Sequence, residues 1–476
     1  MPTEVIVPVH PTGEAEFVFR TAGGPVSLCP TGDALTPYGG LVPWAAFARH
    51  TGIIERLAAT CPAQRTSPNA KPVHDILHSF LLTALVDGRR FAHVERLRED
   101  PTITELFGMK SVVGDDTIKR LFGSIDETAG AAWVTQASVP IWGALPERLI
   151  LDWDSTVQTK YGHQEGAARG YNPVKPGRKS FHPLVAVGAG TRLCAAYRFR
   201  SGDTVTATQW QAAMEDAQAS LGGRQVWLNR GDLGLGHEAI MAWHEAAPAR
   251  PKYLFKLKLT ANVRRALHAL PETAWQGPGE AGVWQVAEAR VRLPGWSAER
   301  RVVFARKLQG DTPALAQGQF WRQVKHELAA YVTNLDEPTA NAWQVQTLYR
   351  ERADAENVFD ELKNQWGFNG FCARSRRVSA LAARLLLLVY NLWSLFVRLL
   401  EPTRHVEAAG SRRWFLVIAA RLVQSGRHKT LQVSVQGRWW EQLKTGYTRV
   451  AQWLASTAPQ LKIPPPLPRQ TTLARA

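Results

Sequence analysis

The order of short apolar runs between residues 148 and 258 constrains the fold more than any other feature of this chain. Three runs predict strands at 149–154, 183–187 and 192–200. Helical and strand-like segments then alternate: helix 204–221, strand 225–228, helix 238–246 and strand 253–257. The order β-β-β-α-β-α-β predicts an α/β fold, a mixed sheet with helices on its faces.

This order is that of a ribonuclease-H-like core, and the next segment predicts an insertion into it. Residues 259–343 alternate in period two between Gly/Pro-rich joints, which predicts an antiparallel β insertion. Helical periodicity returns at 344–366 and again at 380–400. We therefore expect a catalytic core in two parts, 146–258 and 344–400, and the second part carries a long helix with a glutamate.

The helix at 380–400 is apolar enough to raise the question of a membrane. Its longest uncharged run, from Leu385 to Val397, has 13 residues and is bounded by Arg384 and Arg398. A bilayer span needs about 20. The sequence predicts a buried core helix and no membrane partner.

The two ends of the chain flank this core. Residues 1–145 predict a mainly helical, DNA-binding region. Residues 401–476 predict a basic helical region for DNA contact or dimerisation, with a Pro-rich tail from Pro464. The start shows no secretory pattern, and the four cysteines have no C-x-x-C spacing. Both observations fit a protein of the reducing cytoplasm.

Positive charge is concentrated in two stretches. The formal net charge is +16; residues 160–200 hold eight basic residues and one acidic, and residues 401–476 hold twelve and three. The net charges of these two stretches, 8 − 1 = +7 and 12 − 3 = +9, together equal the net charge of the whole chain. Solvated surfaces are the plain alternative, but such clustering is typical of phosphate contact, so we expect a polyanion as partner: nucleic acid, or less often an anionic membrane surface. Double-stranded DNA as that partner is what the family resemblance below implies. The candidate DNA contacts in the first stretch are Lys160, Lys175, Arg178 and Lys179.

Acidic residues stand where the predicted sheet would bind a ligand. Asp152 and Asp154 are two positions apart and share one face of the first strand. A carboxylate in an apolar strand is costly unless it is paired or binds a cation. Asp232 follows the fourth strand, at the edge where α/β sheets bind ligands. The first and fourth strands are neighbours in a ribonuclease-H-like sheet, so Asp154 and Asp232 are predicted to share a metal site.

A third acidic position lies in the helical stretch after the insertion. On one continuous helix, Tyr349, Arg352, Glu356 and Lys363 fall within an arc of roughly 60°. This face would present a carboxylate among a phenol and two cations, which suits a metal ligand beside bound phosphates.

Three converging carboxylates, Asp154, Asp232 and Glu356, suit Mg²⁺, with Mn²⁺ as an alternative. Two such ions would activate a water or a 3′-hydroxyl and stabilise the leaving oxygen in a displacement at phosphorus. Each carboxylate alone fits a helix cap, a surface charge or a salt bridge equally well. The joint pattern favours a catalytic metal site made of these three residues.

At this point the motifs resemble a known family. The helix matches the Y-x2-R-x3-E-x6-K pattern of bacterial insertion-sequence transposases with an Asp-Asp-Glu (DDE) active site. Four segments resemble the group named IS-thirteen-eighty: Asp152-x-Asp154-Ser155-Thr156, Gln164-Glu165-Gly166, Gly170-Tyr171-Asn172-Pro173 and His182-Pro183-Leu184. The resemblance covers roughly residues 145–400. The context of Asp232, Asn229-Arg230-Gly231-Asp232-Leu233-Gly234, differs from the commoner R-x-D-S/A-G form.

The resemblance implies cut-and-paste movement of a DNA element, by nicking and strand transfer at its terminal inverted repeats in a dimeric synaptic complex. It implies that Asp154, Asp232 and Glu356 bind the metal ions and that Tyr349, Arg352 and Lys363 contact the DNA backbone near the cleaved end. It also implies a bacterial, nucleoid-associated protein.

Two alternatives remain open from the sequence. One is a metal-dependent DNA nuclease without strand transfer, and the other is a non-catalytic DNA-binding protein. The chain has no G-x4-G-K-[S/T] motif, so we expect no nucleotide partner.

Overall fold

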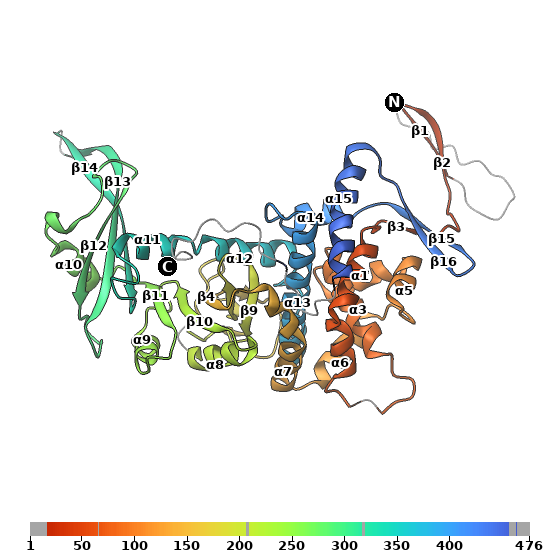
Figure 1. The fold of residues 1–476 in the computed structure, drawn as a ribbon, viewed down its shortest axis with the longest axis horizontal. Coiled ribbons are helices and arrows are strands. Elements are labelled where there is room, and N and C mark those ends of the chain that lie inside the picture. Colours follow the sequence, from red (N-terminus) through yellow and green to blue (C-terminus); the bar gives the residue numbers. More distant parts are fainter. Residues whose placement is uncertain (1–16, 65, 206–208, 317–318, 457–462, 464–476) are drawn as a thin grey trace.

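The computed structural model describes residues 17–64, 66–205, 209–316, 319–456 and 463. The Pro-rich tail and part of the predicted helix 204–221 lie outside the described residues. The molecule is elongated, with a β-rich end and a mainly helical end on either side of the central sheet (Figure 1).

An eight-stranded mixed sheet forms the centre, in the order β12-β13-β14-β11-β10-β4-β8-β9. β4, β10 and β11 are parallel, and β8 and β9 continue the sheet antiparallel on the other side of β4. All five predicted core strands are confirmed, as is the neighbouring position of the first and fourth. Their bounds are β4 Arg148–Ser155, β8 Leu184–Gly188, β9 Leu193–Arg198, β10 Gln225–Gly231 and β11 Lys252–Lys256.

The predicted insertion is antiparallel β structure, but it does not form a separate sheet. β12 Trp284–Val291, β13 Arg300–Ala316 and β14 Gln319–Thr333 pair in sequence, and β14 also pairs with β11. The insertion therefore extends the core sheet at its β11 edge. It also carries the short helix α10 Ala261–His268 and the 3-10 turn η3 Glu272–Ala274.

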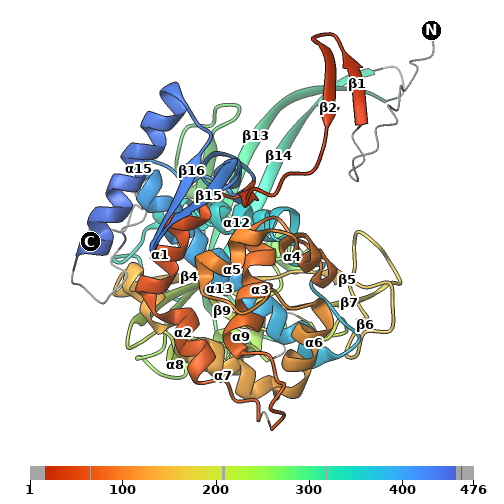
Figure 2. The ribbon, with the colours of Figure 1, turned by 90° about the vertical axis from the view of Figure 1, so that its right-hand side faces the viewer.

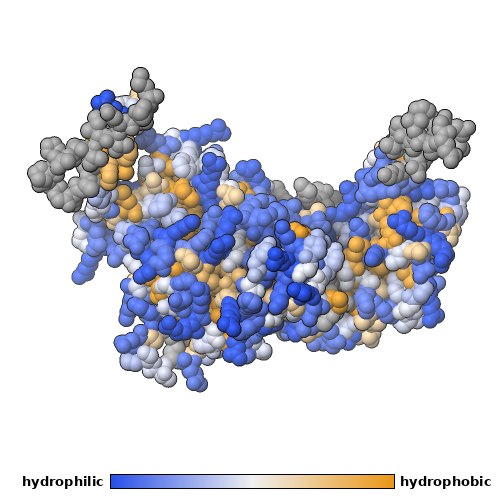
Figure 3. All heavy atoms as spheres, turned by 180° about the vertical axis from the view of Figure 1, so that it is seen from behind, coloured by the Kyte–Doolittle hydropathy of each residue, from blue (hydrophilic) through white to orange (hydrophobic). Residues whose placement is uncertain are grey.

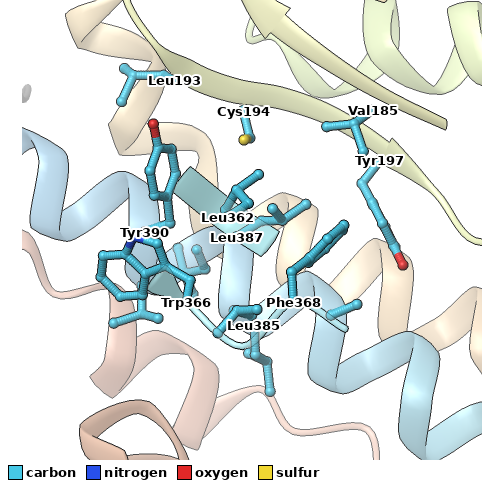
Figure 4. Packing of buried hydrophobic residues seen from close by; sticks show 14 of the residues in the cluster. Val185, Leu193, Cys194, Tyr197, Leu362, Trp366, Phe368, Leu385, Leu387 and Tyr390 are labelled. Carbon is cyan, nitrogen blue, oxygen red and sulfur yellow. The ribbon is translucent and has the colours of Figure 1, made fainter. Parts of the chain in front are cut away.

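Helices cover both faces of the sheet. α8 Trp210–Ser220 and α9 Glu238–Glu245 lie on the face to which Trp153 points, because Trp210 contacts Trp153 at 4.9 Å between ring centroids. α11 Ala342–Arg350, α12 Ala353–Gln365 and α13 Arg376–Leu400 cover the opposite face. Figure 4 shows side chains of β8 and β9 meeting those of α12 and α13 in this layer.

The expected single helix at 344–366 is interrupted. α11 ends at Arg350 and α12 begins at Ala353. At the joint, the Arg352 N–H donates to Tyr349 O, three residues back, so the i→i−4 ladder is locally replaced. The arc calculated for one continuous helix therefore does not apply, and only Glu356 and Lys363 share α12.

α13 is confirmed as a core helix. By length and composition it is the one described helix that could cross a membrane, but 94% of its most apolar window is buried inside the protein. The N-terminal helices α3, α6 and α7 and the C-terminal helix α15 pack around it. The face of the molecule in Figure 3 is predominantly hydrophilic, with separated apolar patches.

The N-terminal region is mainly helical, as predicted, and begins with a small hairpin. Its elements are β1 Phe17–Thr21, β2 Gly24–Leu28, β3 Leu35–Thr36, α1 Leu41–Thr51, α2 Ile53–Ala59, α3 Val73–Leu85, η1 Phe91–Val94, α4 Glu95–Arg98, α5 Pro101–Phe107, α6 Asp115–Ser124, α7 Glu127–Ser138 and η2 Val139–Ala144.

The C-terminal region, predicted as basic and helical, contains two helices and also a β hairpin. Between α14 Ala408–Phe415 and α15 Gly437–Ala455 the chain forms a hairpin, β15 Ala420–Ser425 and β16 His428–Val433. Gly426, at φ +60°, makes the turn. β15 pairs with β3 from the other end of the sequence, a partner that local periodicity cannot reveal. Gly40 is needed at this junction, because a Cβ there would lie 1.8 Å from Phe415 O.

Candidate active site

Asp154 and Asp232 lie at adjacent carboxyl ends of two parallel strands. Asp154 is near the end of β4 and Asp232 directly follows β10, whose last residue, Gly231, pairs with Trp153. Asp154 accepts a hydrogen bond from the N–H of Ser155 at 2.8 Å, and Asp232 accepts one from the N–H of Gly234 at 3.1 Å. Each carboxylate is thus held by a turn at its own strand end.

The Asp154 carboxyl is in an environment that disfavours its charge. Burial and the neighbouring charge of Asp232 raise its pKa to about 6, although Arg352 and Lys363 act in the opposite direction. Two carboxyl groups that repel each other in a half-buried pocket are short of positive charge, which is the condition a divalent cation relieves.

Asp152, on the same face of β4, has a different role. Its carboxylate receives two hydrogen bonds from Arg230 on β10, at 2.6 and 2.7 Å, and both side chains are 1% exposed. Arg230 also donates to the carbonyl of Leu348 in α11 and lies 3.8 Å from Glu351. This buried pair satisfies Asp152 completely and ties β4, β10 and α11 together.

Arg230 was not singled out from the sequence. The signal for it was nevertheless present, because an acidic residue inside an apolar strand needs a buried cation on a neighbouring element. Arg230 is the basic residue of the adjacent strand β10.

Arg352 stands between two of the predicted catalytic carboxylates. Its guanidinium donates to Glu356 Oε1 at 3.1 Å and to Trp153 O at 3.0 Å, and lies 3.7 Å from Asp154 Oδ2. The residue is 3% exposed. In this structure the guanidinium therefore faces the protein's own oxygens, and its contact with DNA stays a prediction.

Glu356 and Lys363 lie on α12 and Tyr349 at the end of α11. The Glu356 side chain is 66% exposed and held by Arg352. Lys363 is half-buried, and its charge reaches Asp154. Tyr349 packs its ring on Tyr331 at 4.6 Å, and burial raises its pKa. α11 starts in a capping box between Asn341 and Gln344, which fixes where this segment begins.

No three acidic, histidine or cysteine side chains among the described residues converge closely enough to hold a metal ion. Asp154 and Asp232 have the donor chemistry and placement for one, whereas Glu356 is engaged by the Arg352 guanidinium. The structure thus places two of the three predicted ligands, Asp154 and Asp232, at adjacent strand ends. The third, Glu356, forms a salt bridge with Arg352.

The basic loop between β4 and β8 divides into exposed and buried cations. Lys175, Arg178 and Lys179 are exposed, beside the small sheet of β5 Gln158–Thr159, β6 Ala168–Arg169 and β7 Lys179–Phe181 (Figure 2). Lys160 is 4% exposed and donates to Asn369 O at 2.9 Å. Lys160 therefore packs inside the protein in this structure, and its contact with a phosphate stays a prediction.

A mixed α/β sheet with two carboxylates at adjacent strand ends and a third on a crossing helix defines a class of metal-dependent phosphoryl-transfer enzymes. The family model described as transposase DDE domain group 1 matches residues 20–454. The chain therefore belongs to this family of DDE transposases, which generally use divalent metal ions for nuclease and transferase chemistry.

The chain is also similar to a solved structure, the cryo-EM structure of a piggyBac transposase synaptic complex with hairpin DNA. It is 11% identical, and the match covers 90% of this chain and 85% of that chain, with a TM-score of 0.39. At that level the likeness carries no argument about the site. No curated protein matches the sequence.

Proposed function

We propose that this transposase binds the terminal inverted repeats of a bacterial insertion sequence, cleaves the ends and joins them to target DNA. The observation that carries the proposal is the placement of Asp154 and Asp232 at the carboxyl ends of neighbouring parallel strands, with Glu356 linked to Asp154 through Arg352. The strand order β9-β8-β4-β10-β11 supports a ribonuclease-H-like core, and the motifs support the IS-thirteen-eighty group.

In this proposal Asp154, Asp232 and Glu356 hold two Mg²⁺ or Mn²⁺ ions. When bound, these ions supply an activated water or 3′-hydroxyl and charge neutralisation at the leaving oxygen. Arg352 is the internal cation that holds Asp154 and Glu356 near each other, and Glu356 would complete the set of residues that hold the metal ions. Arg230 positions the site by fixing β4, β10 and α11 to one another.

The proposal assigns DNA contact to the exposed cations around the site. Lys175, Arg178 and Lys179 are accessible to phosphates, and Lys363 and Tyr349 lie beside the carboxylates. We also propose that the protein works as a homodimer in its synaptic complex and acts at the nucleoid, in the bacterial cytoplasm.

The test uses purified full-length protein and DNA carrying the inverted repeats that flank its coding region, with Mg²⁺ or Mn²⁺. We expect D154N, D232N and E356Q each to lose at least about a hundredfold in end cleavage, because a metal ligand supports several kcal/mol of transition-state stabilisation. Asp360→Asn is the matched control, since Asp360 is exposed on α12 and bonds only Asn364 among the described residues.

The outcomes of this test distinguish the three candidate functions. Cleaved ends that join target DNA support transposition. Cleavage without joining, under conditions where pre-cleaved ends also fail to join, indicates a nuclease. Binding with no cleavage in any metal indicates a non-catalytic DNA-binding protein. An E356Q variant that cleaves as fast as D360N contradicts the site assignment.

A further inference from the structure

A cavity lies along β9, the edge strand of the central sheet, and Trp153 of β4 is among its lining residues. It has a volume of about 850 Å³ and is bounded by α7, α8, α13 and residues 194–199 of the edge strand. This size is within the range of small-molecule sites. None of Asp154, Asp232 and Glu356 lines it.

The charged side chains that line the cavity are paired, with one exception. Arg376 makes two hydrogen bonds to Glu127, at 2.8 and 3.0 Å, and Arg198 makes one to Asp216 at 2.7 Å. Arg384 of α13 is the third guanidinium, and no carboxylate remains among the lining residues to balance it. The lining therefore has an excess of one positive charge.

One nitrogen of the half-buried Arg384 side chain lacks an acceptor. Its Nε is buried and has no hydrogen-bond partner among the described residues, and its guanidinium lies over the ring of Tyr197, 5.2 Å from the centroid. Burial lowers the pKa of this arginine, although the charges of Glu127 and Asp216 act in the opposite direction. A guanidinium with an unused N–H beside a cavity can bind an anion there.

Further unsatisfied donors line the same cavity. The Tyr197 hydroxyl and the Trp142 indole N–H are both buried without a hydrogen-bond partner in the described part of the chain. The walls are mixed: alanines of α7, α8 and β9 and Leu387 and Leu388 of α13 form their apolar part, and side chains such as Gln136, Gln209 and Asn391 form their polar part. Tyr197 and Leu387 can be followed in Figure 4.

We propose that this cavity binds a small organic anion, whose carboxylate or phosphate pairs with Arg384 and whose flat apolar body lies against the alanine and leucine walls. The Tyr197 hydroxyl then donates to the same anionic group. The site is independent of the phosphoryl-transfer chemistry proposed above, and its success or failure does not depend on that function.

The test measures binding to the full-length protein by isothermal titration calorimetry, without DNA or metal. The probes are 1-naphthoate and 1-naphthyl phosphate, which share a flat body and differ in head group, and neutral 1-naphthylmethanol. We expect at least one anion to bind with a one-to-one stoichiometry and to bind about tenfold or more weakly to Arg384→Met, which keeps the apolar stem. Arg404→Met, at an exposed arginine just beyond α13, is the control and is expected to bind as wild type.

A second readout covers the possibility that a variant folds poorly. Without ligand, Arg384→Met is expected to melt close to the temperature of wild type, because methionine keeps the apolar stem of the side chain. The bound anion is expected to raise the melting temperature of wild type alone. Tyr197→Phe removes only the hydroxyl and is expected to lower anion affinity about threefold or more, with no change for 1-naphthylmethanol. Failure of wild type to bind either anion, or equal anion binding by wild type and both variants, would overturn the proposal.

Discussion

At the scale of single residues, two carboxylates on one strand face show how the surroundings set a role. Asp152 and Asp154 are chemically identical and point the same way, yet Asp152 is neutralised by Arg230 and Asp154 is left beside Asp232. The paired residue stabilises the fold, and the under-compensated one is the candidate ligand. The spacing of the two residues in the sequence does not distinguish these two roles.

His244 carries a prediction at this scale. It is a buried residue of α9, its Nδ1–H donates to Pro251 O at 2.8 Å, and burial lowers its pKa to about 4, from an ordinary value near 6.5. The folded protein thus keeps His244 neutral while the unfolded chain binds a proton below about pH 6.5. Stability is expected to fall as pH drops from about 6.5 toward 4, by up to about 3 kcal/mol from this residue.

The measurement is the free energy of unfolding in urea across that pH range, for wild type and His244→Gln. The stability difference between them should shrink steadily toward pH 4, because glutamine has no proton to bind. His163→Gln changes an exposed histidine and serves as the reference. A difference that stays constant with pH would show that His244 titrates alike in the folded and unfolded states.

At the scale of elements, the site depends on a junction of three of them. Arg230 joins β10 to β4 through Asp152 and to α11 through the carbonyl of Leu348. The interruption between α11 and α12 lies against this junction and places Arg352 over the end of β4. The broken helix is therefore part of how the carboxylates are arranged.

Arg230→Met is expected to lower the free energy of unfolding by about 3–5 kcal/mol, since it leaves Asp152 charged, buried and unpaired. The double variant D152L/R230M should recover most of that loss, because two apolar side chains replace the pair. Urea denaturation followed by circular dichroism gives both values.

The control is Arg98→Met, which breaks an exposed pair with Glu95 and should lower the free energy of unfolding by no more than about 1 kcal/mol. A single variant as stable as wild type would rule out Arg230 as the link between these elements.

At the scale of the whole molecule, the described parts of the N-terminal and C-terminal regions pack together on one side of the central sheet (Figure 1). β3 pairs with β15, and α1 packs against α15, so the N- and C-terminal regions form one body around α13 (Figures 1 and 2). The basic C-terminal stretch and the basic loop after β4 belong to the same molecule, and we expect DNA to be the partner of both.

The charge of the loop gives a prediction at this scale. Replacing Lys175, Arg178 and Lys179 together by glutamine should lower the slope of log affinity for duplex DNA against log salt by about 2.7, if each cation neutralises one phosphate. Fluorescence anisotropy over a salt series measures the slope. Arg56→Gln, an exposed change on α2, is the control. An unchanged slope would place the DNA elsewhere on the molecule.

The sequence by itself determined the strands of the core, the antiparallel insertion, the burial of α13 and the positions of Asp154 and Asp232, because local periodicity and the order of elements fix these features. Only the tertiary structure decided which cations are accessible: Lys160 and Arg352 are buried, whereas Lys175 is exposed. It also decided the pairing of Asp152 with Arg230, the break before α12 and the strand pair that joins the two ends. Each of these rests on contacts between residues distant in sequence, and periodicity along one segment contains no information about its partner.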